Sequence, residues 1–373
     1  MLPSLPARRS LLRFAQCAHR VQARCQSTDS QPKVVFSGIQ PTGIPHLGNY
    51  LGALQQWVKL QDTVGPDDTV IYSIVDLHAL TMPKDAAQLQ EWRTQMLASL
   101  LAVGLDPAKS TIFYQSDVPA HSELMWLLSC HASVGYLSRM TQWKSKMDVA
   151  TDSNIDSMAV RQKLKLGLFS YPVLQAADIL VHRATHVPVG DDQRQHLEFA
   201  RELAIGFNAN VLRAPVLVKP TTLFSPARRV MSLEDPANKM SKSQGSDLSR
   251  IYITDSEEEI RRKIVKARTD SVRGVSYDTK TRPGVSNLVE IMWHLGGAAS
   301  VDDVVNGCKD LDMKDFKAKV ADTVVERLAP IRDRYLDFMD RPEHLREIAD
   351  HGADKARERA GETMRQVRDA IGL

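Results

Sequence analysis

The chain has 373 residues, 43% of them hydrophobic and 25% charged, with a formal net charge of +3. This composition is ordinary for a globular protein, and the length allows more than one domain and a sizeable core. No apolar run is long enough to cross a bilayer, and the four cysteines show no C-x-x-C spacing. These patterns argue against a membrane protein, a zinc site and a disulfide framework.

The first thirty residues have a composition of their own. Five arginines and one acidic residue, Asp29, are their only charges, and Leu11, Leu12 and Phe14 can form the apolar face of a basic helix. The pattern predicts a mitochondrial transit peptide over residues 1–30 and import into the mitochondrial matrix, with a disordered tail as the alternative. Without this segment the formal charge would be −1, so RNA binding would depend on local basic patches.

The stretch KVVFSGIQPTGIPHLGNY joins a strand to a helix through a glycine-rich loop. Val34–Phe36 has the composition of a strand, Ser37–Gly43 carries turn residues, and the apolar spacing over Leu51–Val58 predicts a helix. Backbone N–H groups at the start of this helix can face an anion, and His46 adds a further donor. An ordinary loop with an incidental histidine is the alternative, because neither common phosphate fingerprint is present.

Further alternation of strands and helices follows. Thr69–Val75 is expected to be a buried strand that ends at Asp76–His78, Gln88–Val103 a helix, and Thr111–Tyr114 the next strand. This order predicts an α/β fold with a doubly wound, parallel, Rossmann-like sheet and right-handed crossovers. Ligand sites of such sheets lie at the carboxyl ends of the strands, where His78 is expected.

Residues 122–180 have a mainly helical pattern, which predicts a helical insertion. Helices are expected over Glu123–Ser129 and Arg161–Phe169, on either side of a flexible polar loop at Ser145–Ser157. Pro172 is expected in the first turn of a further helix, where a missing N–H costs little.

The chain then returns to one more strand before it becomes helical. His186–Val189 resembles a short strand, and the next four residues open a helix that runs to Gly206. Later helices are expected at Asn287–Leu295, at Asp315–Leu336 and from Leu345 onward, and Ser256-x-x-Glu259 forms a capping box ahead of an earlier one. The sequence therefore predicts an α/β domain at residues 31–250 and an all-α domain at residues 251–373.

A second motif, KMSKS at residues 239–243, lies far downstream of the glycine-rich loop. Alone it could be a solvated basic turn, although two lysines among small residues suit a mobile loop that closes on polyphosphate. PHLGN at residues 45–49 and KMSKS, in this order, resemble the two signatures of class I aminoacyl-tRNA synthetases. Asn49 replaces the second histidine of H-x-G-H, which is typical of the tryptophanyl branch. Similarity to bacterial and mitochondrial tryptophanyl-tRNA synthetases continues through GIQPTG, NYLGAL, VDLHALT, VPAH, RMTQWKSK, YPVLQAADIL, VPVGDDQRQH and MSLEDPANKMSKS.

The resemblance implies a two-step reaction. ATP with Mg²⁺ would activate L-tryptophan as tryptophanyl-adenylate, and the tryptophanyl group would pass to tRNA(Trp) for mitochondrial translation. The family further implies a homodimer and a helical C-terminal domain that binds the anticodon. The sequence shows no carboxylate cluster with metal-ligand spacing, so we expect no protein-bound metal. We also expect no membrane partner, because no apolar run is long enough to cross a bilayer.

The resemblance assigns the nucleotide site to the two signatures and to two further lysines. The expected catalytic residues are Gln40, His46, Lys239 and Lys242. The expected ATP-binding residues are Gln40, Gly48, Asn49, Lys144, Lys146, Gly190, Asp191, Asp192, Lys239, Met240, Ser241, Lys242 and Ser243. These groups would supply positive charge where negative charge develops on phosphate, and Gly48 would leave room for the adenine. A solvated surface lysine is the alternative for Lys144 and Lys146.

The amino acid is expected on another set of side chains. The expected tryptophan-binding residues are Phe36, His78, Tyr171, Gln175, Asp178 and Gln193. The family implies that Asp178 accepts the indole N–H, which is the one polar group of that side chain and can only donate. A cap or salt bridge is the alternative for Asp178, and a structural role is the alternative for His78. The chain departs from some bacterial members at Gln175, where they have Met, and at Leu77, where they have Gln.

Three other classes of protein share parts of this pattern. A tyrosine synthetase has the same fold, but AAD at residues 176–178 and GDDQ at residues 190–193 argue against it. Small nucleotidylyltransferases use a similar first loop, but they lack a helical C-terminal domain. A non-enzymatic RNA-binding relative would not need Gln40, His46 and both signature lysines, although a second RNA role stays open.

Overall fold

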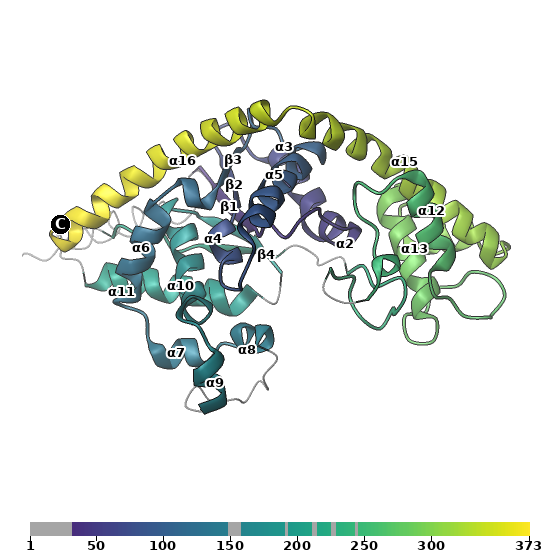
Figure 1. Ribbon diagram of the computed structural model, residues 1–373, viewed down its shortest axis with the longest axis horizontal. Helices are drawn as coiled ribbons and strands as arrows, with labels where there is room; N and C mark the ends of the chain where they lie inside the picture. The colour runs from purple at the N-terminus through teal and green to yellow at the C-terminus, as the bar shows by residue number, and fades with distance from the viewer. Residues whose placement is uncertain (1–31, 148–157, 191–192, 211–214, 225–228, 243–244) are drawn as a thin grey trace, which may run out of the picture.

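The computed structural model describes residues 32–147, 158–190, 193–210, 215–224, 229–242 and 245–373. Its centre is a five-stranded parallel sheet with the order β3-β2-β1-β4-β5 (Figure 1). The strands are β1 (Val34–Ile39), β2 (Thr69–Ile74), β3 (Thr111–Tyr114), β4 (His186–Val189) and β5 (Thr221–Phe224). The first four strands confirm the sequence prediction, which did not identify β5. The direction of winding reverses between β1 and β4, where such sheets bind ligands.

Helices cover both faces of the sheet. On one face, Val70, Tyr72 and Ile74 of β2 belong to a core shared with the helices that follow β1 and β2. Ile71, between them, points into the opposite core. The first face is covered by α2 (Leu47–Asn49), the π-helical η1 (Tyr50–Leu54), α3 (Gln55–Thr63) and α5 (Ala86–Ala102). The second is covered by α6 (Ala120–Ser129), α10 (Leu166–Val181) and α11 (Arg194–Ala209). Shorter elements are α4 (Asp76–Ala79), η2 (Gln115–Asp117), α7 (Val134–Arg139), α8 (Gln142–Lys146) and α9 (Met158–Lys163).

Two expectations for the helical insertion are wrong. The helix expected over Arg161–Phe169 is broken, because α9 ends at Lys163 and α10 begins at Leu166. Pro172 consequently lies inside α10 and not in its first turn. Most side chains of α10 are buried, so tertiary packing compensates for the N–H that the proline lacks. The expected start of the polar loop, Ser145, lies within α8, which extends to Lys146; residues 148–157 lie outside the described part of the chain.

A group of helices follows the KMSKS motif, which we call the helical group. Its elements are η4 (Asp247–Ser249), α12 (Glu257–Lys266), α13 (Pro283–Gly296), α14 (Val301–Asn306) and α15 (Met313–Met339). The predicted capping box is present, because Ser256 accepts from Glu259 N and the Glu259 carboxylate accepts from Ser256 N. The apolar stripe of α15 is buried from Phe316 to Tyr335. The short α14 was not predicted.

The last helix, α16 (Pro342–Ile371), leaves the helical group and runs back across the sheet (Figure 1). Its first half packs into one core and its second half into the other, so it passes over the open edge of β3. At the crossing a Cβ on Gly352 would lie 1.8 Å from Ile112 O, so only glycine fits there. The domain division at residue 250 stays a prediction, since α16 contacts both parts. Among the described residues no helix is long and apolar enough to span a membrane.

Candidate functional site

A pocket of about 410 Å³ opens at the carboxyl ends of β1 and β4, and we call it the strand-end pocket. The structure brings together in it all six residues that the sequence assigned to tryptophan: Phe36, His78, Tyr171, Gln175, Asp178 and Gln193. Gln40, Lys146 and Gly190 from the nucleotide set also line it. Phe36 of β1 and residues 187–189 of β4 form apolar walls of the pocket.

The polar groups of the strand-end pocket are bonded to one another. The Tyr171 hydroxyl donates to Gln142 Oε1 at 2.9 Å and lies 3.3 Å from His196 Nε2. Gln175 donates from Nε2 to Gln193 Oε1 at 3.2 Å. The ammonium of Lys146 lies 4.5 Å from the centre of the Tyr171 ring, which is a cation–π contact. These bonds preset the side chains around the space where a ligand would lie.

Asp178 is the most connected group of the pocket. It lies on α10, and only 2% of the residue is exposed. Its Oδ2 accepts from His78 Nε2 at 2.7 Å. Its Oδ1 accepts from Gln115 Nε2 at 2.6 Å and from His121 Nδ1 at 2.7 Å. Burial alone would raise the pKa of this carboxyl, but the charge of His78 and the hydrogen bonds from His121 and His78 hold it well below its usual range. Asp178 is therefore a carboxylate.

The first signature forms a reciprocal cap at the start of α2. His46 N donates to Asn49 Oδ1 at 3.1 Å, and Asn49 N donates to His46 Nδ1 at 3.3 Å. Because Nδ1 accepts, Nε2 carries the hydrogen of the neutral ring. Burial, followed by the charges of Lys242 and Arg250, lowers the pKa of His46 to about 4. The ring is thus a neutral hydrogen-bond donor at physiological pH.

Gly48 has a different immediate role from the one expected. A Cβ at this position would lie 2.9 Å from Cε1 of the His46 ring, so the glycine first makes room for that imidazole. Its expected contact with adenine stays a prediction.

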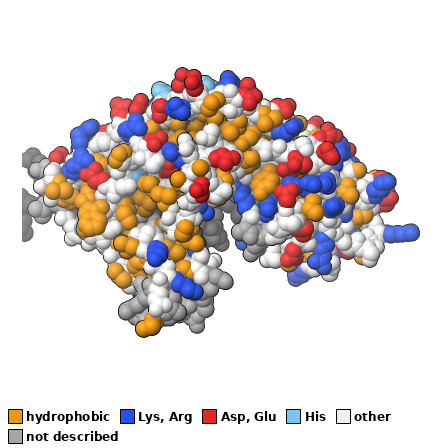
Figure 2. Space-filling view, viewed as in Figure 1, with side chains coloured by type: hydrophobic (Ala, Val, Ile, Leu, Met, Phe, Trp, Pro, Cys, Tyr) orange, Lys and Arg blue, Asp and Glu red, His pale blue; other side chains and the backbone are white. Residues whose placement is uncertain are grey.

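A wider cleft of about 950 Å³ lies between the first signature and the KMSKS motif, and we call it the loop cleft. It is lined by residues that include His46, Asn49, Ser241, Lys242 and Tyr252. Figure 2 shows the surface hollowed between the α7–α9 end of the molecule and the helical group. The two signatures therefore meet at one cleft, next to the strand-end pocket.

Lys242 closes against the first loop in this structure. Its ammonium donates to Gly43 O at 2.9 Å and to Thr42 O at 3.0 Å. Burial, and then the nearby charge of Arg250, lowers the pKa of Lys242 to about 8. Arg250 in turn donates from Nη1 to Ser241 O at 2.9 Å and to Lys242 O at 3.2 Å.

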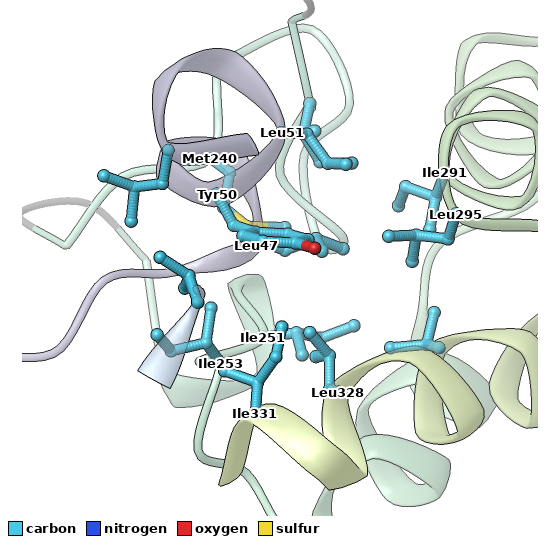
Figure 3. Packing of buried hydrophobic residues seen from close by; sticks show 14 of the residues in the cluster. Leu47, Tyr50, Leu51, Met240, Ile251, Ile253, Ile291, Leu295, Leu328 and Ile331 are labelled. Carbon is cyan, nitrogen blue, oxygen red and sulfur yellow. The ribbon is translucent and has the colours of Figure 1, made fainter. Parts of the chain in front are cut away.

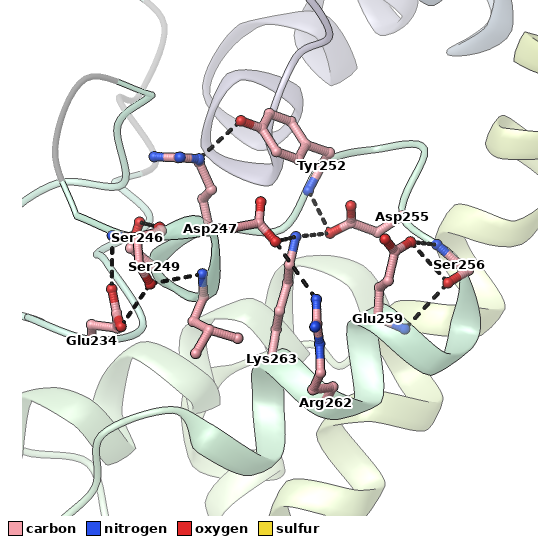
Figure 4. Close-up of polar contacts among 12 residues, drawn as sticks. Glu234, Ser246, Asp247, Ser249, Tyr252, Asp255, Ser256, Glu259, Arg262 and Lys263 are labelled. Atoms are coloured by element: carbon pink, nitrogen blue, oxygen red, sulfur yellow. Dashed lines mark hydrogen bonds and ion pairs between the residues drawn. The ribbon is translucent and has the colours of Figure 1, made fainter.

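The support behind this loop comes from the helical group. Arg250 donates from Nε to the Tyr252 hydroxyl at 2.9 Å, and Tyr252 N donates to Asp255 Oδ2 at 3.0 Å. Asp255 is paired at 2.7 Å with Lys263, whose side chain is 1% exposed (Figure 4). Figure 3 shows Met240 packed with Leu47 of α2 and Tyr50 of η1. Polar and apolar contacts together hold Met240, Ser241 and Lys242 of the motif in place.

Other expected nucleotide residues are placed less directly. Lys239 is exposed, Lys144 is buried beside Trp143, and neither lines the strand-end pocket or the loop cleft. The Met240 side chain lies in the core, so a contact with ATP would have to come from its backbone. Asp191, Asp192 and Ser243 lie outside the described residues. Within the described ranges no three acidic, histidine or cysteine side chains form a metal-binding cluster.

Sequence reasoning missed several groups that hold the site in place. They are Gln115, His121, Gln142, His182, His196 and Arg250. Gln115 could have been found, because it directly follows β3, where ligand-site residues of parallel sheets gather. The histidines have no comparable signal, since a buried histidine in or next to a helix usually belongs to the core.

Known proteins with similar sequences and folds agree with this geometry. A model of the family "tRNA synthetases class I (W and Y)" matches residues 28–329. A mitochondrial tryptophan–tRNA ligase of Schizosaccharomyces pombe is 43% identical over 91% of this chain and 95% of its own length. A tryptophan–tRNA ligase of Rickettsia conorii is 44% identical over 91% and 99%. The structure of tryptophanyl-tRNA synthetase from Campylobacter jejuni, complexed with ADP and tryptophan, is 32% identical with a TM-score of 0.75, over 91% of this chain and all of that one. The chain belongs to the tryptophanyl-tRNA synthetases of class I.

Proposed function

We propose that the protein attaches L-tryptophan to tRNA(Trp), through a tryptophanyl-adenylate, for translation in mitochondria. One observation carries the proposal: the strand-end pocket gathers all six residues expected for tryptophan, and it adjoins the cleft where the two signatures meet. In the first step the tryptophan carboxylate attacks the α-phosphate of ATP and pyrophosphate leaves. The ribose hydroxyl at the tRNA 3′ end then attacks the adenylate and AMP leaves.

The first step needs positioning and positive charge more than covalent help. His46 offers an Nε2–H donor at the start of a helix, and Lys242 offers an ammonium that, among the described residues, donates to the carbonyls of Thr42 and Gly43 and to the Thr42 hydroxyl. A triphosphate in the loop cleft would compete for that ammonium, because a charged acceptor binds it more strongly than a carbonyl. Mg²⁺ would accompany ATP as part of the substrate.

The amino acid side depends on one acceptor in an apolar slot. A carboxylate offers about four lone-pair positions, and the donors on Asp178 occupy two on Oδ1 and one on Oδ2. The remaining position on Oδ2 can accept the indole N–H. A ligand of the same shape without an N–H would leave this buried acceptor unsatisfied, so the pocket would bind it less well.

The helical group supplies the surface for tRNA in this proposal. Arg262 and Lys266 of α12 and Arg268 just after it are exposed, and Figure 2 shows basic side chains gathered on this part of the molecule. Such local patches can hold phosphates although the overall charge is small.

The protein is proposed to act in the mitochondrial matrix as a homodimer. Mitochondrial relatives support the location, and residues 1–30 have the composition of a transit peptide. An exposed apolar side chain on α6, Trp126 at 70%, supports a second copy, because a large exposed tryptophan favours an interface.

Amino-acid-dependent exchange of pyrophosphate into ATP tests the proposed function. Tryptophan should support exchange, whereas tyrosine at the same concentration should not. Exchange with tyrosine alone would show that the protein is a synthetase for tyrosine. No exchange with either amino acid, by a folded protein that still binds tRNA, would favour the non-enzymatic RNA-binding class.

A further inference from the structure

We propose that His121, supported by His182, is a positioning residue for the selection of tryptophan. It holds Asp178 in one orientation, so that the free lone pair of Oδ2 faces the strand-end pocket. The inference rests on the proposed role of Asp178 as the acceptor of the indole N–H, and the experiment below separates the two.

Both histidines lie behind the pocket and do not touch its space. Each has an exposed fraction of 0%, and neither lines the strand-end pocket. His121 is on α6 and contacts Asp178 through Nδ1 at 2.7 Å, while its Nε2 lies 3.2 Å from His182 Nε2. His182 follows the end of α10, the helix that carries Asp178. The three side chains therefore form a chain that closes back on one helix.

The hydrogens of this chain can be assigned from its partners. The acceptor Asp178 requires a hydrogen on Nδ1 of His121, and Nε2 of His121 can then accept from Nε2–H of His182. Nδ1 of His182 then has no hydrogen, and it is one of the buried atoms without a hydrogen-bond partner. Burial above all, with a contribution from the charge of Arg359, lowers the pKa of His182 well below its usual value, which keeps that ring neutral. The assignment leaves no buried N–H without an acceptor in this chain.

Neighbouring groups hold the two rings in place. His182 stacks near Phe36 at 5.7 Å between ring centres and meets Phe113 edge-on at 5.6 Å. Arg359 of α16 donates from Nε to His182 O at 2.9 Å. Packing against Phe36 and Phe113 holds the His182 ring in place, so its contact with His121 has a fixed direction.

Removal of His121 should change what Asp178 presents to a ligand. The carboxylate would keep Gln115 and His78 but lose a donor on Oδ1, and burial would then raise the pKa of the carboxyl. A carboxyl that turns or takes up a proton is a poorer acceptor for an N–H. Tryptophan should therefore suffer more than its benzothiophene analogue, which has the same shape and no N–H.

Two substitutions at His121 separate the hydrogen bond from the packing. The amide of His121→Asn places an N–H near the position of Nδ1, whereas His121→Leu fills similar space without a donor. We expect His121→Leu to raise the KM for tryptophan by about 10- to 100-fold, the range for a lost hydrogen bond to a charged group. The KM of the analogue and of ATP should change by only a few-fold. His121→Asn should restore most of the preference for tryptophan.

The pH dependence gives a second readout. In wild type the low pKa of Asp178 should keep the KM for tryptophan constant down to mildly acidic pH. In His121→Leu the raised pKa means that protonation begins at a higher pH, so the KM should rise earlier as the pH falls. Val320→Ala, a fully buried change in α15, is the matched control, which should lower the melting temperature and leave both KM values unchanged.

The outcomes are distinct. Equal losses for tryptophan and the analogue in His121→Leu, or no rescue by His121→Asn, would overturn the inference about His121. Equal losses in Asp178→Ala would overturn the proposed role of Asp178 itself. If His121→Leu does not fold, the pair His182→Leu and His182→Gln carries the same test, because the glutamine amide lies near Nε2. The glutamine should then keep the preference that the leucine loses.

Discussion

Replacement of Arg250 by methionine should impair the function of Lys242, although Lys242 itself is unchanged. Nη1 of Arg250 donates to Ser241 O at 2.9 Å and to Lys242 O at 3.2 Å, and Nε of Arg250 donates to the Tyr252 hydroxyl. Methionine has a similar length but no donor and no charge. The change therefore removes the anchor of the loop and leaves Lys242 in place.

The size of the effect follows from the bonds that are lost. Hydrogen bonds from a charged donor contribute about 1.5–3 kcal/mol, and partial exposure of Arg250 favours the lower end. At 1.4 kcal/mol for each factor of ten, adenylate formation should slow by roughly 10- to 100-fold, with a smaller change in the KM for ATP. The effect should appear in the rate because the loop matters most when charge develops on phosphate.

The same change should also move the pH profile. With a pKa of about 8, Lys242 loses its charge as the pH rises through that value, so wild-type activity should fall on the alkaline side. Loss of the Arg250 charge removes the smaller cause of the low pKa, whereas burial, the larger cause, remains. The alkaline limb should therefore shift upward in Arg250→Met, although not to the ordinary lysine value. Arg250→Lys keeps a charge but lacks the fork of donors. It should therefore slow adenylate formation and leave the alkaline limb of the pH profile unchanged.

Pyrophosphate exchange across neutral and alkaline pH, with pre-steady-state adenylate formation, measures both effects. Lys242→Ala alone and combined with Arg250→Met completes a double-mutant cycle. If Arg250 acts through Lys242, its loss should cost little in the Lys242→Ala background. An equal cost in both backgrounds, or an alkaline limb that does not move, would refute the reasoning.

Two further predictions concern the location and the assembly of the protein. A fusion of residues 1–30 to a fluorescent protein should enter mitochondria, and the fusion with its five arginines changed to glutamine should stay in the cytosol; cytosolic wild-type fusion would contradict the transit peptide. Trp126→Asp should convert a sedimenting dimer to a monomer, because it places a charge in an apolar contact. An unchanged sedimentation coefficient would exclude Trp126 from the interface.

Local sequence rules were sufficient for four of the five strands, whereas the members of the strand-end pocket came from the family resemblance. The strands β1 to β4 are rich in β-branched and aromatic residues. The carboxyl ends of neighbouring parallel strands must lie at the same edge of the sheet. Tyr171, Gln175 and Asp178 share a helical face because of their spacing. Their convergence with His78 followed from these two regularities.

Contacts between distant elements could not be predicted in this way. His121 lies 57 residues before Asp178, and nothing in the local pattern of α6 indicates which side chain it meets. Pro172 was misplaced because a local rule favours helix starts, whereas the packing of α10 tolerates the proline inside. The sequence predicted a helix from Leu345 onward but not its partner, which is the edge of β3.

The position of α16 has a consequence for the order in which the protein can mature. The outer edge of β3 presents backbone groups that could pair with a strand of another chain, and α16 is what covers it. The covering helix is about 230 residues further along the chain than the strand it shields, so the sheet segments leave the ribosome or a translocation pore well before it. During that interval the nascent sheet is open to wrong partners, and holding it in solution is a task for chaperones until the C-terminal helix arrives.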